Sequence, residues 1–271
     1  MRGAFLGAAL LAATIPGAAA LAADTVPVRV VVVTMFEEGD DTDDGPGELQ
    51  GWVERYPLAE TIPFPVGERD LRYNRDREVL AIVTGMGTAR AAASITALGL
   101  DPRFDLSRAY WIVAGIAGAN PDTAPLASAV WARWIVDGDL AFEIDAREIP
   151  ADWPTGYLPL FETTPYPQPP PPDRYGLAYR LNPALVERAH ALTRDIALPD
   201  SPALAAWRAN YAGHPAAGLP PQVMEGDVLS ASTFWHGDLL NDWATRWVPY
   251  WTGGAGVFAT SAMEDSGTLA A

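Results

Sequence analysis

The chain has no cysteine, no lysine and only three histidines among its 271 residues. The lack of cysteine excludes disulfides, thiolate nucleophiles and cysteine-rich zinc sites. The histidines (His190, His214 and His236) are widely spaced, so we expect no histidine-based metal site. All 18 basic residues are arginine and stand against 34 acidic residues, which gives a formal charge of −16. So acidic a surface repels nucleic acid and anionic membranes, and small molecules remain as the expected partners.

Long apolar runs are also missing, except at the N-terminus. Residues 1–22 carry one positive charge, an alanine-rich run and Ala20-Leu21-Ala22 before Ala23, a pattern typical of a cleaved signal peptide. An uncleaved anchor is the alternative, but Pro16-Gly17 interrupts the run. We therefore predict an exported protein, periplasmic or secreted. No later stretch has the apolar length of a spanning helix, so the mature chain is not expected to span a membrane.

Residues 23–271 repeat a strand, a glycine turn and a helix. This order predicts one α/β domain, with a ligand site at the carboxyl ends of its strands. The expected strands are 28–34, 78–84, 109–114, 128–136, 141–146, 223–229 and 256–260, and the expected helices are 88–98, 182–195 with Asn182 as cap, and one from Ser261 onward. The proline-rich segment 165–172 reads as a rigid surface loop rather than a linker between domains.

Small residues follow two of the expected strands. Gly85-Met86-Gly87 lets backbone amides approach a ligand at a helix N-terminus, although a tight turn explains it equally well. Gly115 to Gly118 form a second turn of this kind. Two such turns favour a shared crevice, and close packing of strand on helix is the alternative.

Carboxylates follow other expected strands. Glu37, Glu38 and Asp40 to Asp44 follow the first expected strand, and such acids are either part of a site or a solvated loop. A carboxylate in Glu225-Gly226-Asp227 or Met263-Glu264-Asp265 suits the vicinal hydroxyls of a ribose. The alternative is an acid that stabilises a helix N-terminus. The tryptophan-rich segment 235–251 contains stacking candidates, but a packed aromatic cluster is the default for most of them. Neither a nucleophile elbow nor a Walker loop is present.

In order along the chain, these segments resemble the purine nucleoside permease family. The segments that carry the resemblance are Thr34-Met35-Phe36-Glu37-Glu38-Gly39, Thr84 to Thr88, Val113 to Pro121, Gly156 to Leu160, Pro165-Tyr166-Pro167, Glu225-Gly226-Asp227 and Met263 to Thr268. The family is distantly similar to nucleoside phosphorylases and nucleosidases. The resemblance implies a single-domain mixed sheet flanked by helices.

The resemblance also implies roles for single residues. Met263-Glu264 would hold the ribose, and Gly85, Met86 and Gly87 would line the sugar and nucleophile region, with Gly115 nearby. Glu38, or its rival Glu37, would position an attacking water. We therefore interpret Glu37 and Glu38 as the rim of the site and Asp40 to Asp44 as a solvated loop. Asp227 would precede backbone contacts to the base near Leu229 and Ser230. Nucleosidases place a phenylalanine where this chain has Leu229, so stacking must come from elsewhere.

One departure from the pattern concerns the C-terminus. Related enzymes carry an aspartate or asparagine after a further strand, whereas this sequence stops at Ala271, so it looks truncated relative to the family. We therefore predict purine nucleoside binding in uptake, together with a membrane transporter partner. The alternative is an exported enzyme that cleaves the N-glycosidic bond, with phosphate as co-substrate if it is a phosphorylase. No other cofactor is expected, and by analogy of fold we expect a homo-oligomer.

Overall fold

The computed structural model describes residues 25–45, 47–170 and 174–271. The predicted signal peptide, residues 1–22, lies outside the described residues, as do residues 171 and 172 of the proline-rich loop. Within the described ranges, none of the helices combines the length and the apolar character that crossing a bilayer demands.

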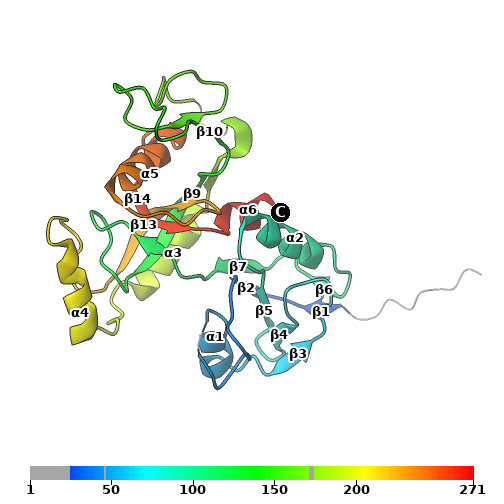
Figure 1. Cartoon of the computed structure of the whole chain (residues 1–271). Coiled ribbons are helices and arrows are strands. Elements are labelled where there is room, and N and C mark those ends of the chain that lie inside the picture. Colours follow the sequence, from blue (N-terminus) through cyan, green and yellow to red (C-terminus); the bar gives the residue numbers. More distant parts are fainter. Residues whose placement is uncertain (1–24, 46, 171–173) are drawn as a thin grey trace, which may run out of the picture.

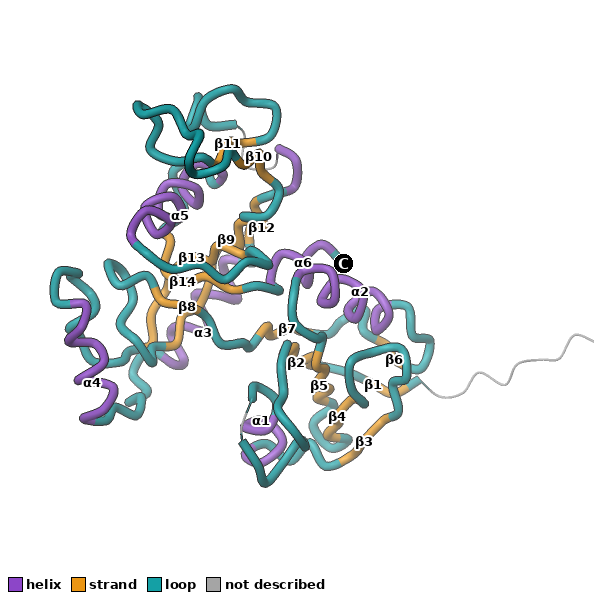
Figure 2. The backbone as a smooth tube through the Cα atoms, in the orientation of Figure 1, coloured by secondary structure: helices purple, strands orange, loops and turns teal. Residues whose placement is uncertain are grey.

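The main strands form two five-stranded sheets, each flanked by helices (Figures 1 and 2). The first sheet has the order β3 (Glu60–Ile62), β4 (Leu71–Asn74), β5 (Val79–Val83), β2 (Val30–Thr34) and β7 (Tyr110–Val113). The second has the order β12 (Ala178–Arg180), β9 (Ala129–Asp137), β13 (Val223–Ser230), β14 (Phe258–Ala262) and β8 (Gly118–Ala119). Each has a parallel core of three strands. The antiparallel strands β3 and β4 extend one edge of the first sheet, and β12 and β8 pair antiparallel at the two edges of the second, so the mixed α/β class is confirmed.

The remaining elements are helices and two short pairs of strands. The pairs are β1 (Val26–Pro27) with β6 (Phe104–Asp105), and β10 (Ala141–Glu143) with β11 (Tyr157–Pro159). The helices are α1 (Gln50–Arg55), α2 (Thr88–Gly99), α3 (Pro183–Thr193), α4 (Pro202–Arg208), α5 (Asp238–Trp251) and α6 (Asp265–Ala270), with 3-10 turns η1 (Arg174–Gly176) and η2 (Ala209–Tyr211).

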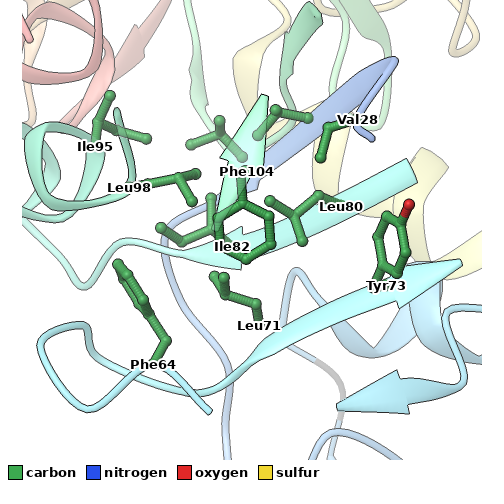
Figure 3. Packing of buried hydrophobic residues seen from close by; sticks show 11 residues of the cluster. Val28, Phe64, Leu71, Tyr73, Leu80, Ile82, Ile95, Leu98 and Phe104 are labelled. Atoms are coloured by element: carbon green, nitrogen blue, oxygen red, sulfur yellow. The ribbon is translucent and has the colours of Figure 1, made fainter. Parts of the chain in front are cut away.

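The first sheet is apolar on both faces because successive side chains of a strand point to opposite sides. Val31 and Val33 of β2 pack with Ile95 and Leu98 of α2 on one face, in the cluster drawn in Figure 3. Val32, on the opposite face, belongs to a second cluster with residues next to and within α1. The continuous valine run is therefore a central strand that is covered on both sides.

The second sheet is covered by α5 on one face and α3 on the other (Figure 2). The buried side of α5 is aromatic, with Trp243, Trp247 and Trp251 packed on Leu229 and Phe258. This confirms the packed cluster as the main role of the tryptophan-rich segment.

The expected strands and helices agree with the structure to within a few residues, with one clear exception. Asn182 caps α3 as expected, because its side chain accepts hydrogen bonds from the amides of Ala184 and Leu185. The last helix does not begin at Ser261, since β14 continues to Ala262 and α6 begins at Asp265. Pairing with β13 along residues 260–262 overrides the local helical pattern there.

Asp227 sits at an irregularity in the middle of the second sheet. The register shifts there on both sides of β13, and such a bulge leaves backbone N–H groups without ladder partners. The Asp227 carboxylate accepts hydrogen bonds from the amides of Arg133 (3.1 Å), Trp134 (2.9 Å) and Val257 (2.6 Å), and the residue is fully buried. It joins β9, β13 and the chain that enters β14.

Replacing Asp227 with alanine should therefore destabilise the fold. The variant leaves three partly buried amides without an acceptor, and we expect its free energy of unfolding to fall by about 3 kcal/mol in urea titrations. Asp195→Ala is the matched control, because that side chain is 92% exposed. An equal effect of the two substitutions would contradict the role given to Asp227.

Candidate functional site

The two sheets are joined where α6 packs against the start of α2, side by side in Figure 1. The approach is close: a Cβ on Gly267 would lie 2.1 Å from the carbonyl oxygen of Thr88, so only glycine fits at this position. The Thr88 hydroxyl donates to the carbonyl of Met263 at 3.0 Å, which ties α2 to the end of β14. The amide of Ser266 donates to the Ser230 hydroxyl at 2.9 Å, which ties α6 to β13.

Glu264 is the carboxylate at this junction. Its Oε1 accepts a hydrogen bond from the amide of Gly87 at 2.8 Å, so a residue that follows β14 binds the turn that follows β5. Gly85 and Gly87 have φ values of +82° and +98°, a region that only glycine adopts without strain. The two glycines therefore let the turn present an amide to Glu264. This turn and Met263-Glu264, predicted separately from the sequence, lie together.

Glu48 is a second carboxylate of the site, and the sequence analysis missed it. It accepts hydrogen bonds from the amides of Met35 (2.7 Å), Phe36 (3.3 Å) and Ile116 (2.8 Å). It therefore fixes the carboxyl ends of β2 and β7, and the close contact at Gly115 belongs to the same arrangement. No motif singles out Glu48, because its partners are backbone amides and the fold alone brings them together.

Burial and mutual repulsion set the electrostatics of this cluster. Burial raises the pKa of Glu264, Glu48 adds to the rise, and the amide of Gly87 opposes it. Burial raises the pKa of Asp265 to about 7, and the charges of Glu264 and Glu48 act in the same direction. Among the described residues, no arginine or histidine lies within 4.0 Å of these three carboxylates. In the described part of the chain they do not form a metal-binding group.

Glu37 and Glu38 have different surroundings. Glu37 is buried, and its carboxylate accepts hydrogen bonds from the amides of Glu38 (3.1 Å), Gly47 (2.6 Å) and Gln50 (2.6 Å). It thereby orders the loop that enters α1. The side chain of Glu38 is exposed. The structure brings neither side chain into a hydrogen bond with Glu48 or Glu264.

The acidic loop after Glu38 is only partly solvated, which corrects the interpretation of residues 40–44 as a solvated loop. Asp41 pairs with Arg69 (3.0 Å) and Arg72 (2.6 Å), and its side chain is 15% exposed. Two arginines of the β3–β4 hairpin region therefore hold the loop against the first sheet. No local pattern predicts this pairing, because both arginines lie about 30 residues from Asp41 along the chain.

The remaining predicted residues divide between the junction and the interior. Ser230 is buried and its hydroxyl contacts that of Ser266 at 3.1 Å, at the junction. Met86, in the turn beside the junction, is 52% exposed. Asp227 and Leu229 are completely buried within the second sheet, and the Asp227 carboxylate is taken up by backbone amides.

The charge of Asp265 should make stability depend on pH. Its pKa is raised in the folded state from 3.8 to about 7, so the folded chain retains a proton that the unfolded chain releases. The free energy of unfolding should therefore fall as pH rises from about 4 to about 7, by up to about 4 kcal/mol from this group.

Asp265→Asn should remove that part of the slope, which urea titrations at pH 4.5 and 7.5 measure. The variant should gain stability relative to the unmodified chain at the higher pH. A pH slope that is identical in both proteins would contradict the burial of an uncompensated carboxylate at Asp265.

Comparison with known proteins identifies the chain's relatives. Residues 27–271 match the family described as Purine nucleoside permease (NUP). The chain is 31% identical over 206 residues to a probable purine nucleoside permease of Schizosaccharomyces pombe, covering 73% of this chain and 59% of the relative. It is 31% identical over 232 residues to a purine nucleoside permease of Candida albicans, covering 82% and 56%. The chain thus spans little more than half the length of these curated relatives.

Solved structures show a likeness of fold alone. A mutant of Helicobacter pylori MTAN with 5'-methylthioadenosine in its active site matches with a TM-score of 0.52 at 12% identity, covering 89% of this chain and 77% of that one. The 5'-methylthioadenosine/S-adenosyl homocysteine nucleosidase from the same organism, complexed with a pyrrolidinol compound, gives a TM-score of 0.52 at 12% identity, covering 90% of this chain and 78% of that one. The family match covers most of the chain and agrees with the order of the motifs. The chain therefore belongs to the purine nucleoside permease family.

Proposed function

We propose that the chain binds purine nucleosides, holding the ribose at Glu264, as a step in nucleoside uptake. The observation that carries the proposal is the carboxylate of Glu264 at the junction of the two sheets. Its Oε1 accepts a hydrogen bond from the amide of Gly87 at 2.8 Å, and no arginine or histidine of the described residues lies within 4.0 Å of the carboxylate. Two neighbouring hydroxyls of a ribose can donate to one carboxylate, which gives a paired and oriented contact.

The relatives support nucleosides as the ligand class. The curated relatives are named purine nucleoside permeases, and one structure with this fold holds 5'-methylthioadenosine, itself a purine nucleoside, in its active site. The strand ends that meet at Glu48 and Glu264 are also the edge where open parallel sheets bind ligands.

The proposed role in uptake is that of a binding component. The predicted signal peptide would place the mature chain outside the cytoplasm, where nucleosides arrive. A chain that binds there would pass the nucleoside to a separate membrane transporter, because passage through a bilayer requires spanning segments.

Glu264→Gln should weaken the binding of inosine through loss of the contact to the ribose hydroxyls. We expect isothermal titration to give a dissociation constant at least tenfold higher for the variant, since hydrogen bonds to a charged group contribute about 1.5–3 kcal/mol. The loss should shrink to less than threefold for 2′,3′-dideoxyinosine, which has no diol to bind.

Glu143→Gln serves as the matched control, because Glu143 is an exposed glutamate on β10, outside the junction. An equal loss for inosine and its dideoxy analogue would place the ribose elsewhere. If the unmodified chain does not bind inosine, the proposed function is wrong.

A second candidate function is cleavage of the N-glycosidic bond. The observation in its favour is the group of carboxylates without cationic partners, because departure of the base leaves positive charge on the ribose that such a group stabilises. In that reaction Glu38 or Glu37 is the proposed residue that positions the water.

The same charge disfavours phosphate as the acceptor. Arg90, the nearest arginine to the Gly85 turn in sequence, has a 63% exposed side chain and lies 3.7 Å from Glu68. If the chain cleaves inosine, chromatography should therefore show free hypoxanthine at equal rates with and without phosphate. A rate that depends on phosphate would contradict this assignment.

A further inference from the structure

Phe234 is an exposed aromatic side chain beside the proposed site. It follows β13 in the segment 231–237, which leads into α5, and it is 76% exposed. Burying an apolar ring against another apolar surface is favourable, so an exposed phenylalanine beside the site can contribute to binding an apolar part of a ligand.

The segment that carries Phe234 is fixed to the junction by hydrogen bonds. The amide of Ser232 donates to both carboxylate oxygens of Asp139, at 3.0 and 2.9 Å. The hydroxyls of Ser232 and Thr88 are 2.9 Å apart, and Thr88 also bonds the carbonyl of Met263. The amide of Ala231 donates to the carbonyl of Ala262 at 2.9 Å. Phe234 is therefore only two residues from Ser232, in a segment that hydrogen bonds hold at the junction.

A small hollow lies at the same place, between the carboxyl ends of β13 and β14. Its lining residues are Ala231, Thr233, Phe234, Trp235, Ser261 and Ala262. Trp235 forms a fixed wall, because its ring packs against those of Trp243 (6.2 Å between centroids) and Phe258 (6.1 Å). Phe234 has no ring partner of this kind among the described residues, so its ring is free for a ligand.

The hollow is close to Glu264 along the chain, which is where the base of a nucleoside would lie if Glu264 holds its ribose. Ala262 lines it, and Glu264 is the second residue further on. Base and ribose are joined by a single bond, so the two subsites must adjoin. Leu229 stands where nucleosidases have a phenylalanine, but it has no aromatic ring and is completely buried in the core.

We propose that Phe234 is the stacking surface for the purine base and so determines the preference for nucleosides with large flat bases. This inference rests on the proposed nucleoside binding at Glu264. The base lies against the Phe234 ring at the mouth of the hollow, while the ribose contacts Glu264. Stacking of a base on an aromatic ring depends on flat apolar area and not on hydrogen bonds, so it tolerates different purines.

The test is the affinity of the Phe234→Ala variant for inosine and for free hypoxanthine, measured by isothermal titration. We expect the dissociation constant to rise about 5- to 100-fold for both ligands. Phe234→Trp, which keeps a flat ring, should bind inosine within about twofold of the unmodified chain. The loss for hypoxanthine separates this role from that of Glu264, which contacts only the ribose.

Phe161→Ala is the matched control, since Phe161 is 72% exposed but packs near Phe142 and Tyr175, away from the junction. It should leave both affinities unchanged. If the unmodified chain binds inosine and Phe234→Ala binds it equally well, the stacking role is wrong while nucleoside binding stands. If Phe161→Ala causes the same loss, the role is also wrong, because the effect is then not specific to this ring. If the unmodified chain does not bind inosine, the proposed function itself fails.

Discussion

The hydrogen bond from the amide of Gly87 to the carboxylate of Glu264 is the contact on which the site depends. It is 2.8 Å long and joins residues that are 177 positions apart, one in the turn after β5 of the first sheet and the other just after β14 of the second. The approach is permitted by backbone geometry: Gly87 has a φ of +98°, and Gly267 lets α6 lie directly on the carbonyl of Thr88. A side chain at Gly267 would push the sheets apart and take Glu264 away from its partner.

Negative charge concentrated at this junction sets its chemistry. Burial raises the pKa of Glu264 and of Asp265, and the nearby charge of Glu48 acts in the same direction on both. Backbone amides hold Glu48 and Glu264 in place of arginine side chains, so their orientation is fixed while their charge is not cancelled. A neutral ligand rich in hydroxyl groups, or one that develops positive charge, suits this environment better than an anion does. The net charge of −16 works in the same direction at longer range.

The sequence predicted the parts of the fold that follow from local pattern. The valine run 30–34 is a central strand, Asn182 caps a helix, and the glycines at 85 and 87 form the turn that meets Met263-Glu264. It did not predict the division of the strands between two sheets, because pairing is set by contacts far apart in the chain. Glu48 was missed for the same reason, since its partners are amides in other segments. Asp41 was predicted to lie in a solvated loop, although its side chain pairs with Arg69 and Arg72 and is only 15% exposed. The roles in ligand binding or catalysis given to Glu37, Glu38, Glu264 and the other candidate site residues stay predictions, as does that of Phe234.

A crystal structure of the chain with bound inosine would show whether Glu264 holds the ribose. We expect density for the nucleoside at the junction of α2 and α6. Its 2′- and 3′-hydroxyls should lie within about 3.2 Å of the Glu264 carboxylate, and the Gly87 amide should remain bonded to Oε1. Inosine bound elsewhere, or bound at the junction with its ribose turned away from Glu264, would show that Glu264 does not hold the ribose.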